Sequence, residues 1–288
     1  YDADGRYTGE AYPYCAGYQH ADSTIVGFSH THFSGTGHSD LGDILVLPVA
    51  AGRVDLRDPP VATFSHAEEA AAPGAYAVTL RGAAGGPVGA ELTATTRVGL
   101  HRYAFAPGDS MSLLVDLAAN IYDYDGKNVW TFVRVENDTL ITGWRQTTGW
   151  ARTRTVYFAM AFDRPLRSYG HVRLDETPYK GFYRRFDQEH DFPEFAGRDI
   201  RARSHFGPAR AGDPLQVKVA LSGVSTAGAL ANLAAEAPGW DFDGVRAAAR
   251  AAWNTELGRF DVAMLDDARR DVFFTALYHT LLGPVVFE

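Results

Sequence analysis

The sequence has very little cysteine, no long hydrophobic run and no excess of positive charge. Cys15 is the only cysteine among 288 residues, which excludes an intramolecular disulfide framework and a zinc cluster built from several cysteines. No run of about 18 apolar residues occurs, so the pattern predicts no transmembrane helix. Acidic residues outnumber basic ones by 35 to 27, and the formal net charge of −8 argues against a dedicated binder of nucleic acid or anionic membranes. Phosphate-loop, dinucleotide and Gly-x-Ser-x-Gly patterns are also absent.

Most of the chain instead shows the pattern of β-strands. From Gly42 to about Gly223, short runs of β-branched and aromatic residues alternate with turn residues. Strands are expected at residues 44–49, 90–98, 111–117, 154–162 and 215–221. Asp125-Gly126 indicates a hairpin turn, which we prefer to a calcium loop formed with Asp123. Because no helices separate these strands, we expect an antiparallel β-sandwich.

After residue 223 the spacing of apolar residues becomes helical. Helices are expected at residues 225–237, at about 242–257, where Asp241 or Asp243 caps the start, and at 267–282. The third helix is apolar nearly all round, which predicts burial on every side. Two or three helices and one end of a sandwich cannot cover it. We therefore expect the chain to be a fragment that stops inside a helical domain.

The densest group of reactive side chains lies at residues 27–43, which contain three histidines, two aspartates, five hydroxyl residues and four glycines. On an extended segment His30 and His32 point the same way, and the glycines of Gly35-Thr36-Gly37 permit a tight turn. Donors and acceptors at fixed positions suit a sugar. The alternative is a buried polar loop whose side chains satisfy backbone groups.

A metal site is a second interpretation of this segment. His30 and His32, followed by His38 and Asp40, are residue types that bind zinc or another transition ion. The spacing matches no specific signature, and histidines on strands often only form hydrogen bonds.

Two further groups have both a functional and a structural interpretation. Trp144 and Trp150 have faces that stack on sugar rings, but tryptophans of a sandwich more often belong to its core. Glu189-His190-Asp191 has acid and base groups beside phenylalanines, and we favour a solvated loop there.

Residues 27–37, Gly-Phe-Ser-His-Thr-His-Phe-Ser-Gly-Thr-Gly, with 40–45, Asp-Leu-Gly-Asp-Ile-Leu, resemble a hallmark of glycoside hydrolase family 92. This family consists of calcium-dependent exo-acting α-mannosidases. Residues 154–162, 238–243 and 274–280 resemble later parts of the family in the same order. The resemblance extends over essentially the whole chain, from residue 18 to residue 287.

The resemblance implies a mainly β fold and a specific division of the chain. Residues 1–224 are expected to form an N-terminal β-sandwich domain, 225–260 a helical linker, and 261–288 the start of an (α/α)6 catalytic barrel whose remainder is absent. The implied enzyme is a secreted or periplasmic bacterial α-mannosidase. It would release mannose from α-mannosides of the N-glycan or yeast-mannan type by a calcium-assisted inverting mechanism.

The resemblance also implies where the site residues lie. The catalytic carboxylates and the calcium ligands belong to the barrel, so we expect them outside this chain and expect the chain alone to be inactive. The sandwich is expected to contribute to the cleft for a mannose-containing oligosaccharide. Its candidate substrate-binding residues are His30, His32, Ser34, Gly35, Thr36, Gly37 and Asp40. The alternatives are a non-catalytic carbohydrate-binding sandwich and a metal-dependent enzyme that uses the three histidines.

Overall fold

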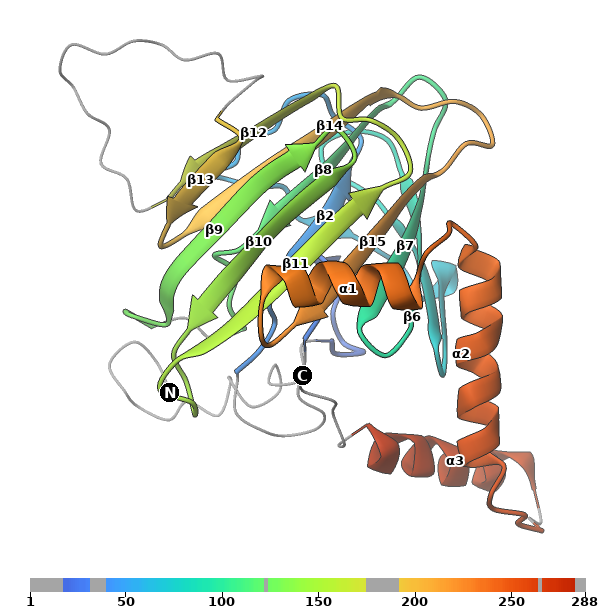
Figure 1. Cartoon of the computed structure of the whole chain (residues 1–288). Helices are drawn as coiled ribbons and strands as arrows, with labels where there is room; N and C mark the ends of the chain where they lie inside the picture. Colours follow the sequence, from blue (N-terminus) through green and yellow to red (C-terminus); the bar gives the residue numbers. More distant parts are fainter. Residues whose placement is uncertain (1–17, 32–39, 122–123, 175–191, 264–265, 283–288) are drawn as a thin grey trace, which may run out of the picture.

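The computed structural model describes residues 18–31, 40–121, 124–174, 192–263 and 266–282, and the structural statements below concern these residues. Two antiparallel sheets pack face to face, and three helices follow at the C-terminal side (Figure 1). A short third sheet pairs β1 (Thr24–Ile25) with β3 (Ala62–Thr63). The predicted class, a mainly β antiparallel sandwich followed by helices, is confirmed.

The larger sheet has nine strands, and every neighbouring pair in it is antiparallel. In spatial order they are β13 (Glu194–Gly197), β9 (Asn128–Asn137), β10 (Leu140–Thr147), β11 (Arg154–Phe162), β15 (Leu215–Ser222), β7 (Val98–Phe105), β6 (Val88–Ala94), β5 (Ala75–Leu80) and β4 (Glu69–Ala72). A 3₁₀ turn, η2 (His66–Glu68), precedes β4.

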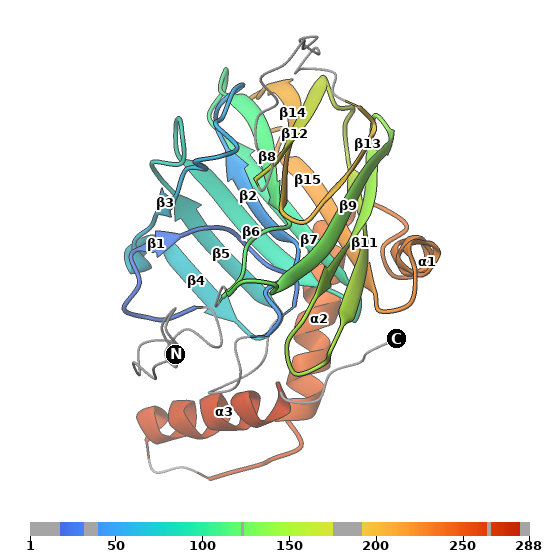
Figure 2. The same ribbon diagram turned by 90° about the vertical axis from the view of Figure 1, so that its left-hand side faces the viewer.

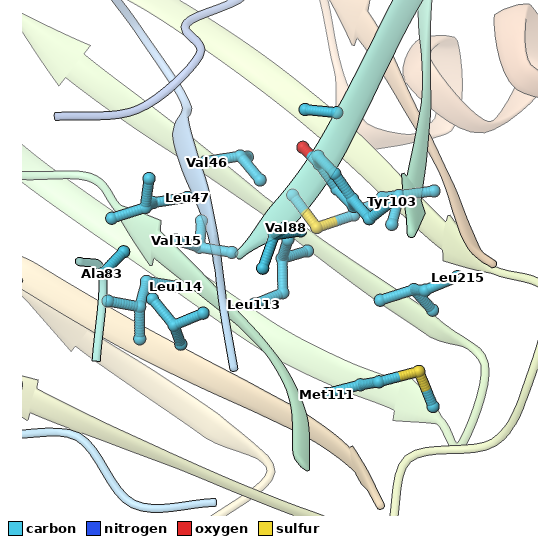
Figure 3. Packing of buried hydrophobic residues seen from close by; sticks show 14 of the residues in the cluster. Val46, Leu47, Ala83, Val88, Tyr103, Met111, Leu113, Leu114, Val115 and Leu215 are labelled. Carbon is cyan, nitrogen blue, oxygen red and sulfur yellow. The ribbon is translucent and has the colours of Figure 1, made fainter. Parts of the chain in front are cut away.

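The smaller sheet has four strands, in the order β12 (Ser168–Arg173), β14 (Ile200–Pro208), β8 (Ser110–Asp116) and β2 (Leu45–Val49). The main hydrophobic core fills the space between the two sheets. Figure 3 shows side chains of the smaller sheet, such as Val46 and Leu113, beside Tyr103 and Leu215 of the larger one. These four side chains are at most 1% exposed.

Helix α1 (Thr226–Glu236) covers the outer face of the larger sheet, where it packs on β15 and β11 (Figure 2). The central strand β15 is therefore covered on both faces, which explains why six of its eight residues are buried, Lys218 and Ser222 among them. Val217 and Val219 belong to the core between the sheets, while Ala220 belongs to the second cluster, under the helices. Lys218, on that outer side, donates to the carbonyl of Ala237 at 2.8 Å.

Helix α2 (Phe242–Leu257) packs on β5, β6 and β7, and α3 (Asp267–Leu281) contacts α2. Each helix begins after a side chain that accepts a backbone N–H of its first turn: Ser225 for α1, Asp241 for α2 and Asp266 for α3. Of the two capping residues predicted for α2, the structure uses Asp241.

Most predicted elements lie within a residue or two of the observed ones, but two predictions are wrong in part. The expected strand at 90–98 is β6 followed by a tight turn, in which Thr95 N–H donates to Val98 O at 2.9 Å, and Val98 already belongs to β7. The turn at Asp125-Gly126 exists, with Gly126 at φ +83°, but it is not a hairpin. It leads from β8 in the smaller sheet to β9 in the larger one.

The rest of this chain leaves the third helix uncovered, as expected from the sequence. Although α3 is rich in apolar residues, no side chain of it is buried in this chain, and Val272 is 70% exposed. No helix among the described residues is long and apolar enough to cross a membrane.

Candidate functional site

A cavity of about 800 Å³ lies where one end of the sandwich meets helices α2 and α3. The turns after β4 and between β6 and β7 form one side of it, and Trp253 and Tyr278 form the helical side. Their rings lie 4.7 Å apart, centroid to centroid. Gly74 in the first turn has φ +83°, and a Cβ there would lie 3.0 Å from Ala249, so a glycine lets α2 approach the sheet.

His30 lies in the wall of this cavity and is bonded at both ring nitrogens. Its Nδ1 lies 2.6 Å from the carbonyl oxygen of Ile44, and its Nε2 lies 2.9 Å from Nε2 of His101. His101 is 4% exposed, and its Nδ1 lies 2.6 Å from the Tyr103 hydroxyl. Burial, with a smaller contribution from the charge of His30, holds the pKa of His101 well below its ordinary value. His101 is therefore neutral at neutral pH.

The backbone around His30 is built for this contact. Residues 28–31 run antiparallel to residues 42–46: Phe28 and Val46 exchange both backbone hydrogen bonds, and His30 N–H donates to Asp43 O at 3.0 Å. Ile44 is fully buried and has φ +53°, a left-handed conformation that is rare for a β-branched residue. Such strain, on the order of 1–3 kcal/mol, persists only where the surroundings enforce it. Here it directs the Ile44 carbonyl to His30.

Asp43 sits beneath this segment in a buried ion-pair network. One carboxylate oxygen accepts from Arg154 and from the Thr31 hydroxyl, each at 2.7 Å, and the other lies 3.4 Å from Arg145. Burial alone would raise the pKa of the Asp43 carboxyl, but the two guanidinium groups and their hydrogen bonds hold that pKa below its ordinary value. Asp43 is therefore an anchor that stays ionised, and it is unsuited to act as a general acid.

Asp40 has a similar anchoring arrangement. Its Oδ1 is ion-paired with the buried Lys127, and its Oδ2 accepts the backbone N–H of Trp150 at 2.8 Å. A Cβ at residue 149 would collide with this carboxylate, so Gly149 allows the approach. Both Asp40 oxygens are thus engaged within the protein. The role of Asp40 in substrate binding stays a prediction. To bind a sugar hydroxyl, Asp40 would have to give up its bond to Lys127 or to the Trp150 N–H.

The structure places two of the seven predicted substrate-binding residues. His30 lines the cavity and Asp40 is buried beside Lys127, while the remaining five, His32, Ser34, Gly35, Thr36 and Gly37, lie outside the described residues. Residues 189–191 and Asp123 also lie outside them. Trp144 is half-buried, with its ring 6.1 Å from that of Phe132. Trp150 is 71% exposed and so is not a core residue.

Sequence reasoning missed the partners of these side chains. His101, Arg145 and Arg154 lie on strands whose alternation indicates only an inward or an outward position. A buried arginine at an inward position, such as Arg145 at 1% exposure, implies a buried carboxylate nearby. The sequence does show an arginine at an inward-facing strand position, but this position does not identify the carboxylate that pairs with it.

Among the described residues, no group of three or more histidine, cysteine, aspartate and glutamate side chains is arranged to hold a metal ion. The two carboxylates of the 40–43 segment, Asp40 and Asp43, are already paired with lysine and arginine. The described part of the chain therefore does not fit a calcium site. The three-histidine metal site includes His32 and His38, which lie outside the described residues, so it stays a prediction.

Comparison with known proteins assigns most of the chain to two adjoining domains of one family. The sequence model of the glycosyl hydrolase family 92 N-terminal domain matches residues 3–222, and that of the catalytic domain of the same family matches residues 228–288. The boundary between the two matches falls at the end of β15 and the start of α1.

Solved structures of this family have the same fold. A family GH92 alpha-mannosidase from Bacteroides thetaiotaomicron matches 96% of this chain with 33% identity and a TM-score of 0.82. A GH92 inverting mannosidase from Bacteroides thetaiotaomicron VPI-5482 matches 93% with 25% identity and a TM-score of 0.74. An uncharacterized secreted glycosidase from Arthroderma benhamiae is 25% identical over 93% of the chain. The matched regions span 37%, 33% and 36% of those proteins, respectively.

Proposed function

The chain belongs to glycosyl hydrolase family 92, and we propose that it is the N-terminal part of an α-mannosidase that releases mannose from α-mannosides of the N-glycan or yeast-mannan type. Two solved relatives are described as mannosidases, one of them as inverting. In this proposal the sandwich supplies one wall of the substrate cleft, and a catalytic barrel, which begins with the helices of this chain, supplies the reacting groups.

The observation that carries the proposal is the chemistry of the cavity. Its wall combines hydroxyl groups, such as those of Ser29 and Thr96, with the aromatic rings of Trp253 and Tyr278. Sugars need hydrogen-bonding groups at fixed positions beside apolar surface, which is also the usual composition of a small-molecule site. The cavity lies where the sandwich meets α2 and α3, so residues of both parts are available to one ligand.

The reacting carboxyl groups are proposed to lie elsewhere. An inverting glycosidase needs an acid and a base about 6.5–9.5 Å apart, with room for water between them. No aspartate or glutamate lines the cavity among the described residues. Asp43 is held ionised by two arginines, so it does not suit an acid that must donate a proton, and both oxygens of Asp40 are engaged by Lys127 and by the backbone N–H of Trp150. The cavity lining of this chain would bind and orient the sugar.

We also propose that the enzyme requires calcium, held by residues outside those described. When bound, calcium would orient and distort the sugar ring through vicinal hydroxyl groups. Export from the cell, to the medium or the bacterial periplasm, is part of the same proposal and is supported by the description of one relative as a secreted glycosidase.

The test compares two proteins: the 288-residue chain, and a complete enzyme in which the same sequence is followed by a family 92 catalytic barrel. Each is incubated with α-mannobiose and with yeast mannan. We expect the complete enzyme to release mannose, first seen by NMR as the β-anomer because the mechanism inverts, and the chain alone to release none. Hydrolysis by the chain alone, or an initial α-anomer, would contradict the proposal. Binding of mannosides by both proteins without hydrolysis would identify the alternative, a carbohydrate-binding sandwich.

A further inference from the structure

Three side chains form a continuous hydrogen-bonded series from the cavity wall into the core of the sandwich. His30 lines the cavity and lies 2.9 Å from His101, Nε2 to Nε2. His101 in turn lies 2.6 Å, through Nδ1, from the hydroxyl of the fully buried Tyr103. His101 and Tyr103 are two residues apart on β7, so they share one face of the larger sheet.

Only one arrangement of hydrogens satisfies these contacts when both histidines are neutral. The Ile44 carbonyl can only accept, so His30 donates through Nδ1 and accepts at Nε2. His101 must then donate through Nε2 and accept at Nδ1, and Tyr103 donates its hydroxyl hydrogen to that Nδ1. The charged groups at this wall leave the histidines without a carboxylate partner among the described residues: Arg97 and Arg154 line the cavity but are paired with Glu236 and Asp43, and no carboxylate lines it.

The larger sheet leaves space for this contact at one residue. Gly99 is two residues before His101 on β7, and a Cβ there would lie 3.1 Å from Cδ2 of His30 and 3.6 Å from Nε2 of His101. The absence of a side chain at Gly99 therefore admits the His30 ring against His101. Together with the left-handed Ile44, this gives two backbone features that favour the same contact from opposite sides of the His30 ring.

We propose that His101 and Tyr103 are positioning residues, which hold the His30 ring at the cavity wall in its Nδ1–H tautomer with both nitrogens engaged. A sugar in the cavity then meets a fixed, uncharged ring, and His30 determines the shape of the site without donating to the substrate through a ring nitrogen. The effect on catalysis rests on the proposed mannosidase function, whereas the tautomers do not.

The first test is long-range ¹H–¹⁵N NMR of the 288-residue protein, labelled with ¹⁵N-histidine, at pH 8. We expect the Nδ1–H tautomer for His30 and the Nε2–H tautomer for His101, with the signals assigned by their loss in His30→Gln and His101→Gln. In Tyr103→Phe, which preserves the volume of the ring, His101 should show the second tautomer as well. A wild-type His101 protonated at Nδ1, or a mixture of tautomers at either histidine, overturns the proposal.

The second test uses the complete enzyme and compares His101→Leu with His101→Gln. Glutamine retains an N–H for His30 and an oxygen for Tyr103, and leucine retains neither. We expect His101→Leu to lower kcat/KM about three- to tenfold, mainly by raising KM, because one hydrogen bond supports a change of that size. The kcat/KM of His101→Gln should stay within about twofold of the wild-type value. His205→Gln, in the smaller sheet and outside the cavity lining, is the matched control.

Equal losses in the leucine and glutamine variants, or no loss in leucine, would mean that the hydrogen-bonded series does not position His30. If the complete enzyme hydrolyses no mannoside at all, the proposed function fails, and the NMR experiment still decides whether the series exists.

Discussion

Replacement of Arg145 by methionine tests how the segment that carries the candidate site is anchored. The Arg145 side chain is 1% exposed and lies 3.4 Å from the equally buried carboxylate of Asp43. It also donates to Oδ1 of Asn128, through Nη2 at 2.7 Å and Nε at 3.2 Å, and to Asn120. Methionine retains an unbranched apolar side chain but neither the charge nor any donor.

The expected loss of stability follows from what remains around Asp43. Removal of one partner from a buried ion pair costs about 3–5 kcal/mol, because the other charge stays buried without compensation. Asp43 would keep Arg154 and the Thr31 hydroxyl, each at 2.7 Å, so we expect the lower end, about 3 kcal/mol. At about 2–4 °C per kcal/mol, Tm should fall by about 6–12 °C.

The measurement is urea denaturation of the 288-residue protein, followed by tryptophan fluorescence, with Arg259→Met as the matched control. Arg259 pairs with Glu256 at 2.8 Å on the surface, where its side chain is 66% exposed, so its loss should cost about 0–1 kcal/mol. A loss for Arg145→Met no larger than that of the control would refute the anchoring role. Asp43→Asn should lower the free energy of unfolding less in the Arg145→Met variant than in the wild type, because both changes remove the same Asp43–Arg145 interaction.

The remaining predictions concern the histidines and calcium. His30→Ala in the complete enzyme should lower kcat/KM about two- to tenfold, because the cavity wall loses the ring that shapes it, and wild-type kinetics with a lower Tm would assign His30 a purely structural role. Burial lowers the pKa of His101 in the folded state, so below about pH 6.5 the unfolded state binds a proton at His101 that the folded state does not bind. Stability should therefore fall as the pH decreases from about 6.5, by up to about 1.4 kcal/mol per pH unit, and this slope should be absent in His101→Gln; urea denaturation at several pH values measures it. Excess chelator should abolish mannose release by the complete enzyme and added calcium should restore it, and full activity in chelator would count against the calcium requirement.

The sequence by itself determined which segments form strands and helices, because those depend on local chemistry. The observed bounds of β11 and α2 agree with the predicted ranges, since alternation, helical spacing and an aspartate cap are properties of neighbouring residues. The resemblance of residues 27–37 to the family hallmark also pointed to the family that the sequence models identify. Where the local pattern ran on through a turn, as at residues 95–97, it misplaced Val98.

Only the tertiary structure decided which side chains meet. Asp43 and Arg145 are 102 residues apart, and His30 and His101 are 71 apart, on strands or segments whose pairing no local pattern specifies. A period of two shows that Gly99, His101 and Tyr103 point to the same side of β7, but not that His30 lies against them. Alternation fixes the direction of a side chain relative to its own sheet. The partner depends on strand order and register, which are set by the packing of the whole sandwich.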